Sequence, residues 1–331
     1  MDKEVSYAKS GDVSIAYTTV GEGPADLVFV PGFVSHLDVQ LSYPAIARMV
    51  ARVSQFARVI AFDKRGTGLS DPVAGAPSVE ECLDDLEAVL GAAGAGTVDL
   101  LGISEGSTIS ALFAARNPDR TRKLILYGSY AKGIAGPDYP WAPTPEQIDL
   151  AGQMIDRDWG HGVFHEIQAP SRADDPEFIA WWARFQRLAA SPAMAKAVTR
   201  LASEIDIRNE LPNVYAPTLV LHRKGDLLWP IEGARFVAGQ IPGAKLVELE
   251  GEDHFPFTGE TDTMLGEIEE FLTGSRQAAD AERQLLTVMF SDIVDSTALA
   301  SRLGDRAWRE MLDTHDDLVR TRIRLGGGRE V

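Results

Sequence analysis

The chain has 331 residues, which is long for one compact domain and indicates a main domain with a further segment. Lysine plus arginine number 32 against 49 aspartates and glutamates, a formal net charge of −17, so we expect neither nucleic acid nor an anionic membrane as a partner. A single cysteine, Cys82, excludes an intrachain disulfide framework, and its acidic helical surroundings favour a buried, inert thiol. No signal-peptide layout and no apolar run of about 18 residues is present, so we expect a cytoplasmic protein.

Strand and helix patterns alternate over the first 133 residues. Residues 5–8 and 13–19 alternate in polarity around a turn and predict an antiparallel hairpin. Continuous apolar runs then predict buried strands, and helical patterns lie between them. The strands fall at 26–30, 58–62, 98–101 and 123–127, and the helices at 43–56 and 78–92. This alternation predicts an α/β fold with a mostly parallel sheet covered by helices.

The segment from 134 to 209 carries no strand signal. It is rich in proline and in aromatic residues, including Trp141, Trp159, Trp181 and Trp182. We expect a helical lid here, with these tryptophans as candidate walls of a substrate pocket. The alternative is that the aromatic side chains form a small core of the lid itself.

The sheet pattern resumes after the lid. Strands are predicted at 217–222 and 244–249, with helices over 231–240 and 261–272. The main domain therefore spans 1–275, with a core of 1–133 and 210–275. A small-residue linker over 276–284 follows, and 285–290 predicts a further strand in a separate segment, 285–331.

The sequence TVDLLGISEGSTIS, residues 97–110, reads as an apolar strand, a serine between two glycines and a helix start. A Gly-x-Ser-x-Gly run in this context is a nucleophile elbow, a sharp turn that presents the serine hydroxyl above a sheet. Gly102 and Gly106 leave room where neighbouring backbone must approach. We therefore predict Ser104 as the nucleophile.

A serine hydroxyl needs a base within hydrogen-bond reach, and an acid must orient that base. On sheets of this kind the partners follow later strands in the order serine, acid, histidine. Asp226 follows the strand at 217–222 and His254 follows the strand at 244–249, so they are the predicted acid and base. Less favoured histidines are His36, His161, His165, His222 and His315, and less favoured acids are Asp63, Asp71, Glu105 and Asp253.

A tetrahedral intermediate also needs backbone donors. We expect the amide of Glu105, directly after the nucleophile, and the amide of Phe33 in the Pro31-Gly32-Phe33 loop. Gly32 and Phe33 would also border the substrate pocket. Acyl transfer requires no metal or cofactor, and none is predicted.

These motifs, together with the run from Phe62 to Ser70, resemble the α/β-hydrolase superfamily over about residues 1–275. They are most similar to bacterial hydrolases fused to an adenylate or guanylate cyclase domain. The run from Leu286 to Thr297 resembles the opening of a class III cyclase domain, and so does the helical pattern at 298–318. The resemblance places Asp292 at a metal-binding aspartate of that family. The rest of that metal site is not present in 285–331, so we expect Asp292 to be a solvated carboxylate.

The sequence therefore predicts a serine hydrolase, resembling a carboxylesterase, that cleaves carboxylic esters of small molecules through an acyl-enzyme. Two alternatives stay open. One is another reaction on the same triad, namely C–C bond cleavage, amide hydrolysis or perhydrolysis. The other is a ligand sensor that regulates an attached cyclase. A homodimer also remains open.

Overall fold

The computed structural model describes residues 4–275 and 294–325. The chain divides into two units, 1–279 and 280–331, and each is described by itself. None of the helices in the described residues is long and apolar enough to cross a membrane.

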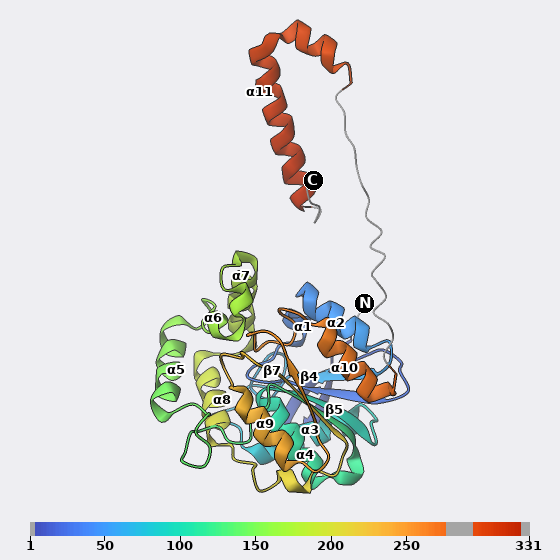
Figure 1. Cartoon of the computed structure of the whole chain (residues 1–331), viewed down its shortest axis with the longest axis vertical. Coiled ribbons are helices and arrows are strands. Elements are labelled where there is room, and N and C mark those ends of the chain that lie inside the picture. Colours follow the sequence, from blue (N-terminus) through green and yellow to red (C-terminus); the bar gives the residue numbers. More distant parts are fainter. Residues whose placement is uncertain (1–3, 276–293, 326–331) are drawn as a thin grey trace. The chain divides into compact units, whose positions relative to one another are not determined.

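An eight-stranded sheet forms the centre of the described first unit (Figure 1). Its strands are β1 (Ser6–Ser10), β2 (Val13–Val20), β3 (Asp26–Val30), β4 (Arg58–Phe62), β5 (Val98–Ile103), β6 (Thr121–Tyr127), β7 (Thr218–Arg223) and β8 (Lys245–Leu249). They lie in the order β1-β2-β4-β3-β5-β6-β7-β8. Strand β2 pairs antiparallel with β1 and β4, and the remaining neighbours pair in parallel. The predicted hairpin and mostly parallel sheet are confirmed.

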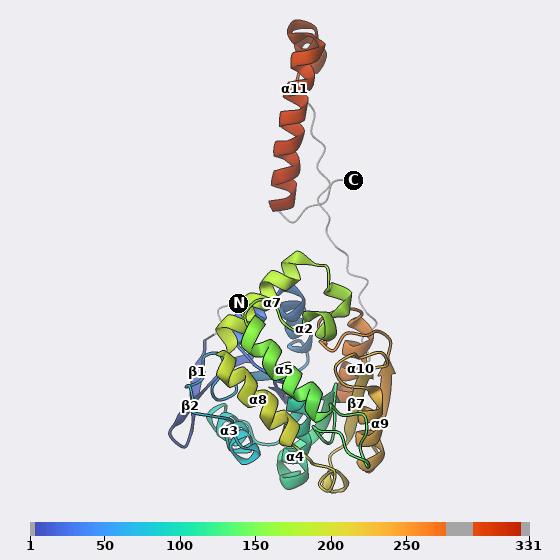
Figure 2. The ribbon, with the colours of Figure 1, turned by 90° about the vertical axis from the view of Figure 1, so that its left-hand side faces the viewer.

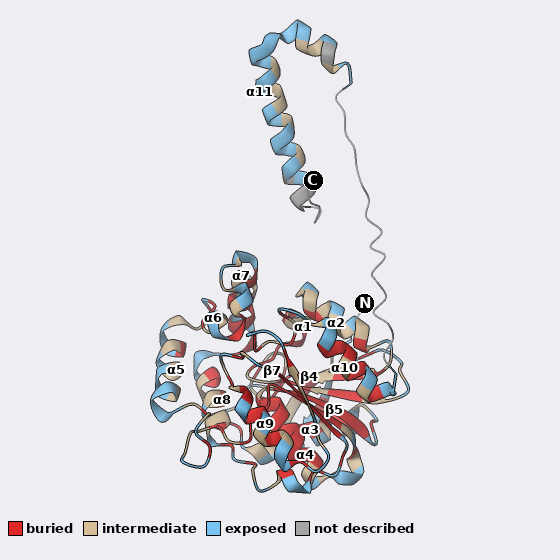
Figure 3. Cartoon of the chain, viewed as in Figure 1, coloured by how far each residue is buried: buried red, intermediate tan, exposed pale blue. Residues whose placement is uncertain are grey.

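Helices cover both faces of this sheet (Figures 1 and 2). One face packs against α3 (Val79–Ala92), α4 (Glu105–Arg116) and α9 (Ile231–Gln240) through a core that includes Leu86, Phe113 and Val237. The other face packs against α2 (Pro44–Val53) and α10 (Asp262–Thr273) through Val53 and Ile268. Figure 3 shows the resulting buried strands between partly exposed helices.

Helix α3 begins with a capping box formed by Ser78 and Glu81. Ser78 accepts a hydrogen bond from the Glu81 amide, and the Glu81 side chain accepts one from the Ser78 amide. This capping box satisfies amides that have no partner within the first turn. The short helix α1 (Leu37–Leu41) was not predicted, because five residues are too few to show helical periodicity.

Four helices lie between β6 and β7, where the sequence predicted a helical insertion. They are α5 (Pro145–Asp158), α6 (His165–Gln168), α7 (Pro176–Ala189) and α8 (Pro192–Glu204). Trp182 and Phe185 of α7 and Met194 of α8 form a separate apolar core with Val34 and Val39. This core fixes the insertion onto the segment that follows β3.

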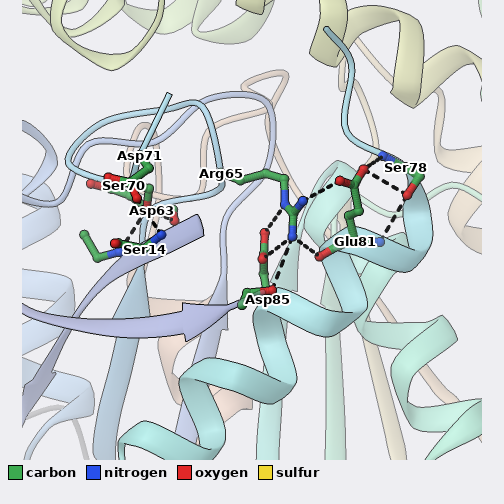
Figure 4. Close-up of polar contacts among 10 residues, drawn as sticks. Ser14, Asp63, Arg65, Ser70, Asp71, Ser78, Glu81 and Asp85 are labelled. Atoms are coloured by element: carbon green, nitrogen blue, oxygen red, sulfur yellow. Dashed lines mark hydrogen bonds and ion pairs between the residues drawn. The ribbon is translucent and has the colours of Figure 1, made fainter. Parts of the chain in front are cut away.

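The loop from Asp63 to Asp71 connects strand β2 with helix α3 (Figure 4). The buried Arg65 guanidinium donates to both carboxylate oxygens of Asp85 and to Glu81 on α3. Asp71 accepts from the Ser14 amide of β2 at 2.7 Å. The loop thus joins strand β2 to helix α3.

The described part of the second unit holds α11 (Ser296–Leu325), which is interrupted at Gly304 (φ 75°, ψ 160°). This helix includes the predicted helical segment 298–318. The predicted linker at 276–284, the predicted strand at 285–290 and Asp292 lie outside the described residues.

Candidate active site

Ser104 occupies the turn between β5 and α4 with φ 55° and ψ −122°, a conformation that is unfavourable for a residue with a side chain. Close backbone packing holds it there. A Cβ atom at Gly102 would collide with the Gly106 carbonyl oxygen, and one at Gly106 would collide with the Val30 carbonyl oxygen. As predicted, both glycines allow the neighbouring backbone to approach closely.

Asp226 and His254 lie side by side in the loops after β7 and β8. The Nδ1 atom of His254 is 2.7 Å from Oδ2 of Asp226, and both residues are buried. Because an ionised carboxylate only accepts hydrogen bonds, Nδ1 carries a hydrogen, and in the neutral imidazole Nε2 then presents a lone pair. Within the described residues, Nε2 of His254 has no hydrogen-bond partner. The ring is therefore set to accept a proton.

The electrostatics of Asp226 favour its ionised form. Burial alone opposes ionisation, but the charge and hydrogen bond of His254 hold the pKa of the carboxyl below its usual value. The amides of Leu228 and Trp229 donate to Oδ1 at 2.9 and 3.1 Å. Both carboxylate oxygens are thereby held in one orientation.

Contacts from three directions fix the His254 loop. Arg223, fully buried at the end of β7, donates to the carbonyl oxygens of four loop residues. These are Asp253, Phe255, Thr258 and Glu260. The Gln168 carbonyl of the insertion accepts from the His254 amide at 2.9 Å. Gly128 (φ 61°) lies beneath the imidazole, where a Cβ would come within 2.8 Å of Cε1.

The less favoured histidines and acids have other partners or positions, although Nε2 of His222 also lies 3.5 Å from Oδ2 of Asp226. Asp253 accepts from the amide and hydroxyl of Ser171, so its carboxylate binds the insertion instead of the imidazole. The Nε2 atom of His222 lies 2.8 Å from the Trp229 carbonyl oxygen, and burial lowers the pKa of His222. His36 begins α1, His161 and His165 belong to the insertion, and His315 is in the second unit.

Glu105 is buried and paired with a lysine that the sequence reasoning did not single out. The Nζ atom of Lys64 lies 2.6 Å from Oε1 of Glu105 and also donates to the carbonyl oxygens of Gly32 and Phe33 at 3.2 Å each. Burial raises the pKa of Glu105, although the Lys64 charge opposes that rise. The sequence contains one signal for this pair. A glutamate directly follows the nucleophile, and a lysine lies in the polar run from Asp63 to Ser70.

Two cavities meet at Ser104. The first, the apolar cavity, has a volume of about 150 Å³ and is bordered by Gly32, Phe33, Ser104 and His254. The second, the wide cavity, has a volume of about 450 Å³ and is bordered by Phe33, Ser104 and Glu105. An ester bound at Ser104 could thus extend in two directions.

Three of the four tryptophans predicted as pocket walls border these cavities. Trp181 and Trp182 border the apolar cavity, and Trp141 borders the wide cavity. Trp159 borders neither; it packs edge-on against Phe33, with ring centroids 5.8 Å apart. Its indole nitrogen donates to the Ala190 carbonyl at 2.8 Å, so Trp159 supports a wall residue.

Sequence reasoning also missed Arg223 and Gly128. Arg223 directly follows the strand predicted at 217–222, and a charge at the end of a buried strand is a signal that something buried must satisfy it. Gly128 follows a predicted strand in the sheet. The need for glycine there arises only from the distant His254 ring.

A family model described as the alpha/beta hydrolase fold matches residues 27–261. The chain belongs to this family. The pimeloyl-[acyl-carrier protein] methyl ester esterase of Nitrosomonas europaea is 27% identical to this α/β hydrolase over 248 residues, which is 74% of this chain and 94% of that protein. The 2-hydroxymuconate semialdehyde hydrolase of Pseudomonas putida is 34% identical over 206 residues, covering 59% of this chain and 69% of the relative.

Solved structures show the same fold. An esterase from Exiguobacterium antarcticum aligns with a TM-score of 0.72 at 22% identity, covering 81% of this chain and 99% of that chain. A bromoperoxidase from Bacillus anthracis aligns with a TM-score of 0.69 at 22% identity and the same coverage. At this identity the likeness establishes the architecture of the hydrolase unit alone.

Proposed function

We propose that this α/β hydrolase cleaves carboxylic esters through an acyl-enzyme, with Ser104 as nucleophile, His254 as base and Asp226 as its orienting acid. The observation that carries the proposal is the buried Asp226–His254 hydrogen bond of 2.7 Å, whose imidazole borders the same cavity as Ser104. A buried acid that orients a base beside a strained serine is the arrangement that serine activation requires.

In the first half of the reaction, Oγ of Ser104 bonds to the ester carbonyl carbon while its proton passes to Nε2 of His254. The carbonyl oxygen becomes an oxyanion. The tetrahedral intermediate then collapses, the bond to the alcohol oxygen breaks, and His254 returns the proton to that oxygen. Water repeats these steps on the acyl-enzyme, releasing the acid and restoring Ser104.

The amides of Phe33 and Glu105 would donate to the oxyanion. Two features support this assignment: Glu105 begins helix α4, so its amide has no acceptor within the helix, and Phe33 borders both cavities beside Ser104. A Cβ at Gly32 would lie 3.0 Å from Cβ of Ser104, so the loop carrying Phe33 packs directly on the elbow.

The relatives support ester chemistry but do not identify the substrate of this chain. The relative from Nitrosomonas europaea is named a methyl ester esterase, and its alignment spans nearly its whole length. The same triad would also serve hydrolysis of C–C or amide bonds, perhydrolysis, or ligand sensing without turnover. For the second unit we infer, from the sequence pattern alone, a resemblance to the start of a cyclase domain.

The direct test uses 4-nitrophenyl acetate with the purified full chain and with Ser104→Ala. We expect release of 4-nitrophenol by the wild type and a loss of at least about 10³-fold in Ser104→Ala. Covalent labelling by a fluorophosphonate should occur in the wild type and be lost in the same variant. A wild type that neither turns over esters nor is labelled would favour the sensor alternative.

A further inference from the structure

The apolar cavity extends from Ser104 along one face of the sheet. It is bordered by Leu101 and Ile103 of β5, Leu27 and Phe29 of β3, Val59 and Ala61 of β4, and Thr18 and Val20 of β2. The bordering residues are two apart on each strand, so their side chains point to the same face. Strand β2 lies three strand spacings from β5, about 14 Å at the usual separation.

Helices α2 and α10 form the opposite wall. Their bordering residues are apolar: Ile46, Met49, Val50 and Val53 of α2, and Met264, Leu265 and Ile268 of α10. Packed sheet and helix surfaces normally interdigitate with few voids. Here Phe29 and Ala61, on two neighbouring inner strands, are only partly buried. The space between sheet and helices is therefore incompletely filled.

We propose that this space is an acyl channel, which takes the linear hydrocarbon chain of a medium- or long-chain fatty acyl ester while its carbonyl lies at Ser104. The inference rests on the proposed function. Ser104 and His254 border this same cavity, so a chain attached to the reacting carbonyl can extend directly into it. A charged or hydroxylated chain would lose hydration against these walls, whereas a hydrocarbon chain gains by burial.

The test compares 4-nitrophenyl esters from acetate to dodecanoate. In the wild type, kcat/KM should rise with each added methylene, by at most about fourfold per step, until the channel is filled. Ala61→Leu adds bulk to the channel and should lower the ratio of decanoate to acetate kcat/KM at least tenfold. The control is Ala238→Leu, the same change in α9 on the opposite sheet face, which should leave the ratio within twofold.

A second readout needs no turnover. Decanoate should bind the inactive Ser104→Ala variant at least tenfold more tightly than it binds Ser104→Ala/Ala61→Leu. If Ala61→Leu does not fold, the smaller Ala61→Val takes its place. An unchanged chain-length preference in the folded Ala61 variant would overturn the proposed channel, even if the variant hydrolyses the acetate ester normally. Absence of any ester hydrolysis or fluorophosphonate labelling would instead reject the proposed function.

The Lys64–Glu105 pair carries a second, independent inference. The Glu105 amide is a proposed oxyanion donor, so a carboxylate on that residue places negative charge next to the charge that develops in the transition state. Both side chains are almost fully buried, 9% exposed for Lys64 and 4% for Glu105, so water screens this repulsion poorly. Lys64 supplies the compensating positive charge at 2.6 Å.

Lys64 also controls the other proposed donor. It donates to the Gly32 carbonyl, which shares a planar peptide with the Phe33 amide. In a trans peptide the C=O and N–H point in opposite directions, so fixing the carbonyl fixes the direction of the Phe33 N–H. All three ammonium hydrogens have acceptors, namely the carbonyls of Gly32 and Phe33 and the Glu105 carboxylate.

We infer that Lys64 is a positioning residue that orients one oxyanion donor and neutralises the side chain of the other. Lys64→Met should lower kcat for 4-nitrophenyl acetate at least 100-fold with KM changed less than threefold. Glu105→Gln should lower kcat less than Lys64→Met does, because the neutral amide places no negative charge beside the developing oxyanion. The double variant should be at least tenfold faster than Lys64→Met, a rescue that a merely structural role would not produce.

Lys123→Met is the matched control, because Lys123 also donates to two backbone carbonyls, those of Phe271 and Leu272, away from Ser104. It should leave kcat within threefold. A folded Lys64→Met with wild-type kcat, or a double variant no faster than Lys64→Met, would overturn the inference. If Lys64→Met does not fold, Glu105→Gln provides the test. A loss of kcat beyond 100-fold in Glu105→Gln would overturn the inference, because it would show that the negative charge itself is required.

Discussion

The Nδ1 atom of His254 and Oδ2 of Asp226 lie 2.7 Å apart although 28 residues separate them in the chain. Helix α9 and strand β8 lie between them in sequence, and the parallel pairing of β7 with β8 brings the two following loops to the same sheet edge. The hydrogen bond is buried and holds the imidazole in one orientation. An oriented base lowers the entropic cost of reaching the transition state.

Replacing Asp226 by Asn tests this orientation. The amide can donate to Nδ1 and stabilise the wrong tautomer, so we expect kcat for 4-nitrophenyl acetate to fall about 10³- to 10⁴-fold. His254→Ala should fall at least as far. Both variants should keep the circular dichroism spectrum and the thermal unfolding temperature of the wild type, so that the loss of kcat reports on catalysis and not on folding. Near-normal turnover by His254→Ala would show that another residue is the base.

The pKa of Asp226 predicts a pH dependence of stability. Because folding lowers this pKa, the ionised carboxyl stabilises the fold above its usual value of 3.8, and that contribution is lost as pH falls through the lower folded value. The unfolding free energy of wild type relative to Asp226→Asn should therefore decrease below about pH 4. Urea titrations from pH 3 to pH 7 measure it. A difference that grows as pH falls would contradict the assignment.

Arg223 should stabilise both the fold and the catalytic loop. Arg223→Met removes the donor of four carbonyl oxygens, two in buried and two in partly buried contacts, so we expect a loss of at least about 3 kcal/mol and a lower kcat. Arg235→Met is the control, because its ion pair with Glu248 is solvent-exposed and contributes about 0–1 kcal/mol. Urea unfolding measures both losses of unfolding free energy. Equal losses in the two variants would show that the buried Arg223 stabilises the fold no more than an exposed arginine does.

A comparison of Gly128→Ala with Gly94→Ala separates the effect of backbone strain from the effect of crowding the catalytic histidine. Both glycines have positive φ, 61° and 66°, but a Cβ at Gly128 would meet His254, whereas one at Gly94 would meet nothing within 4 Å. Each change to Ala should cost about 1 kcal/mol through backbone strain. Only Gly128→Ala should also lower kcat, by at least tenfold, since it displaces the imidazole. A similar kcat loss in Gly94→Ala would contradict this reading.

Local patterns in the sequence predicted much of the architecture. Strands β3 and β4 and helix α9 have the predicted bounds, because continuous apolar runs and helical periodicity are set by neighbouring residues. Strand β5 runs two residues further than predicted, through Gly102 and Ile103, because pairing with β6 continues up to the elbow. That extension depends on another strand, so the local pattern could not contain it.

The candidate triad was predictable because its members follow an order along the chain. Ser104 has a local motif, and Asp226 and His254 each follow a strand that the pattern located. The other partners of the site carry no such order. Lys64, Arg223 and Gly128 act on atoms between 30 and 126 residues away by their numbers in the sequence. Their roles exist only once the parallel strands place those loops at one edge.

The sequence by itself thus determined the strand and helix pattern, the elbow and the order of the candidate triad, because these depend on residues close in the chain. The tertiary structure alone decided that Lys64 meets Glu105, that Arg223 holds the His254 loop, and that a channel lies beneath α2 and α10. Buried charges must find partners, and cavities remain where facing side chains do not interdigitate. Both outcomes depend on which distant surfaces the fold brings together.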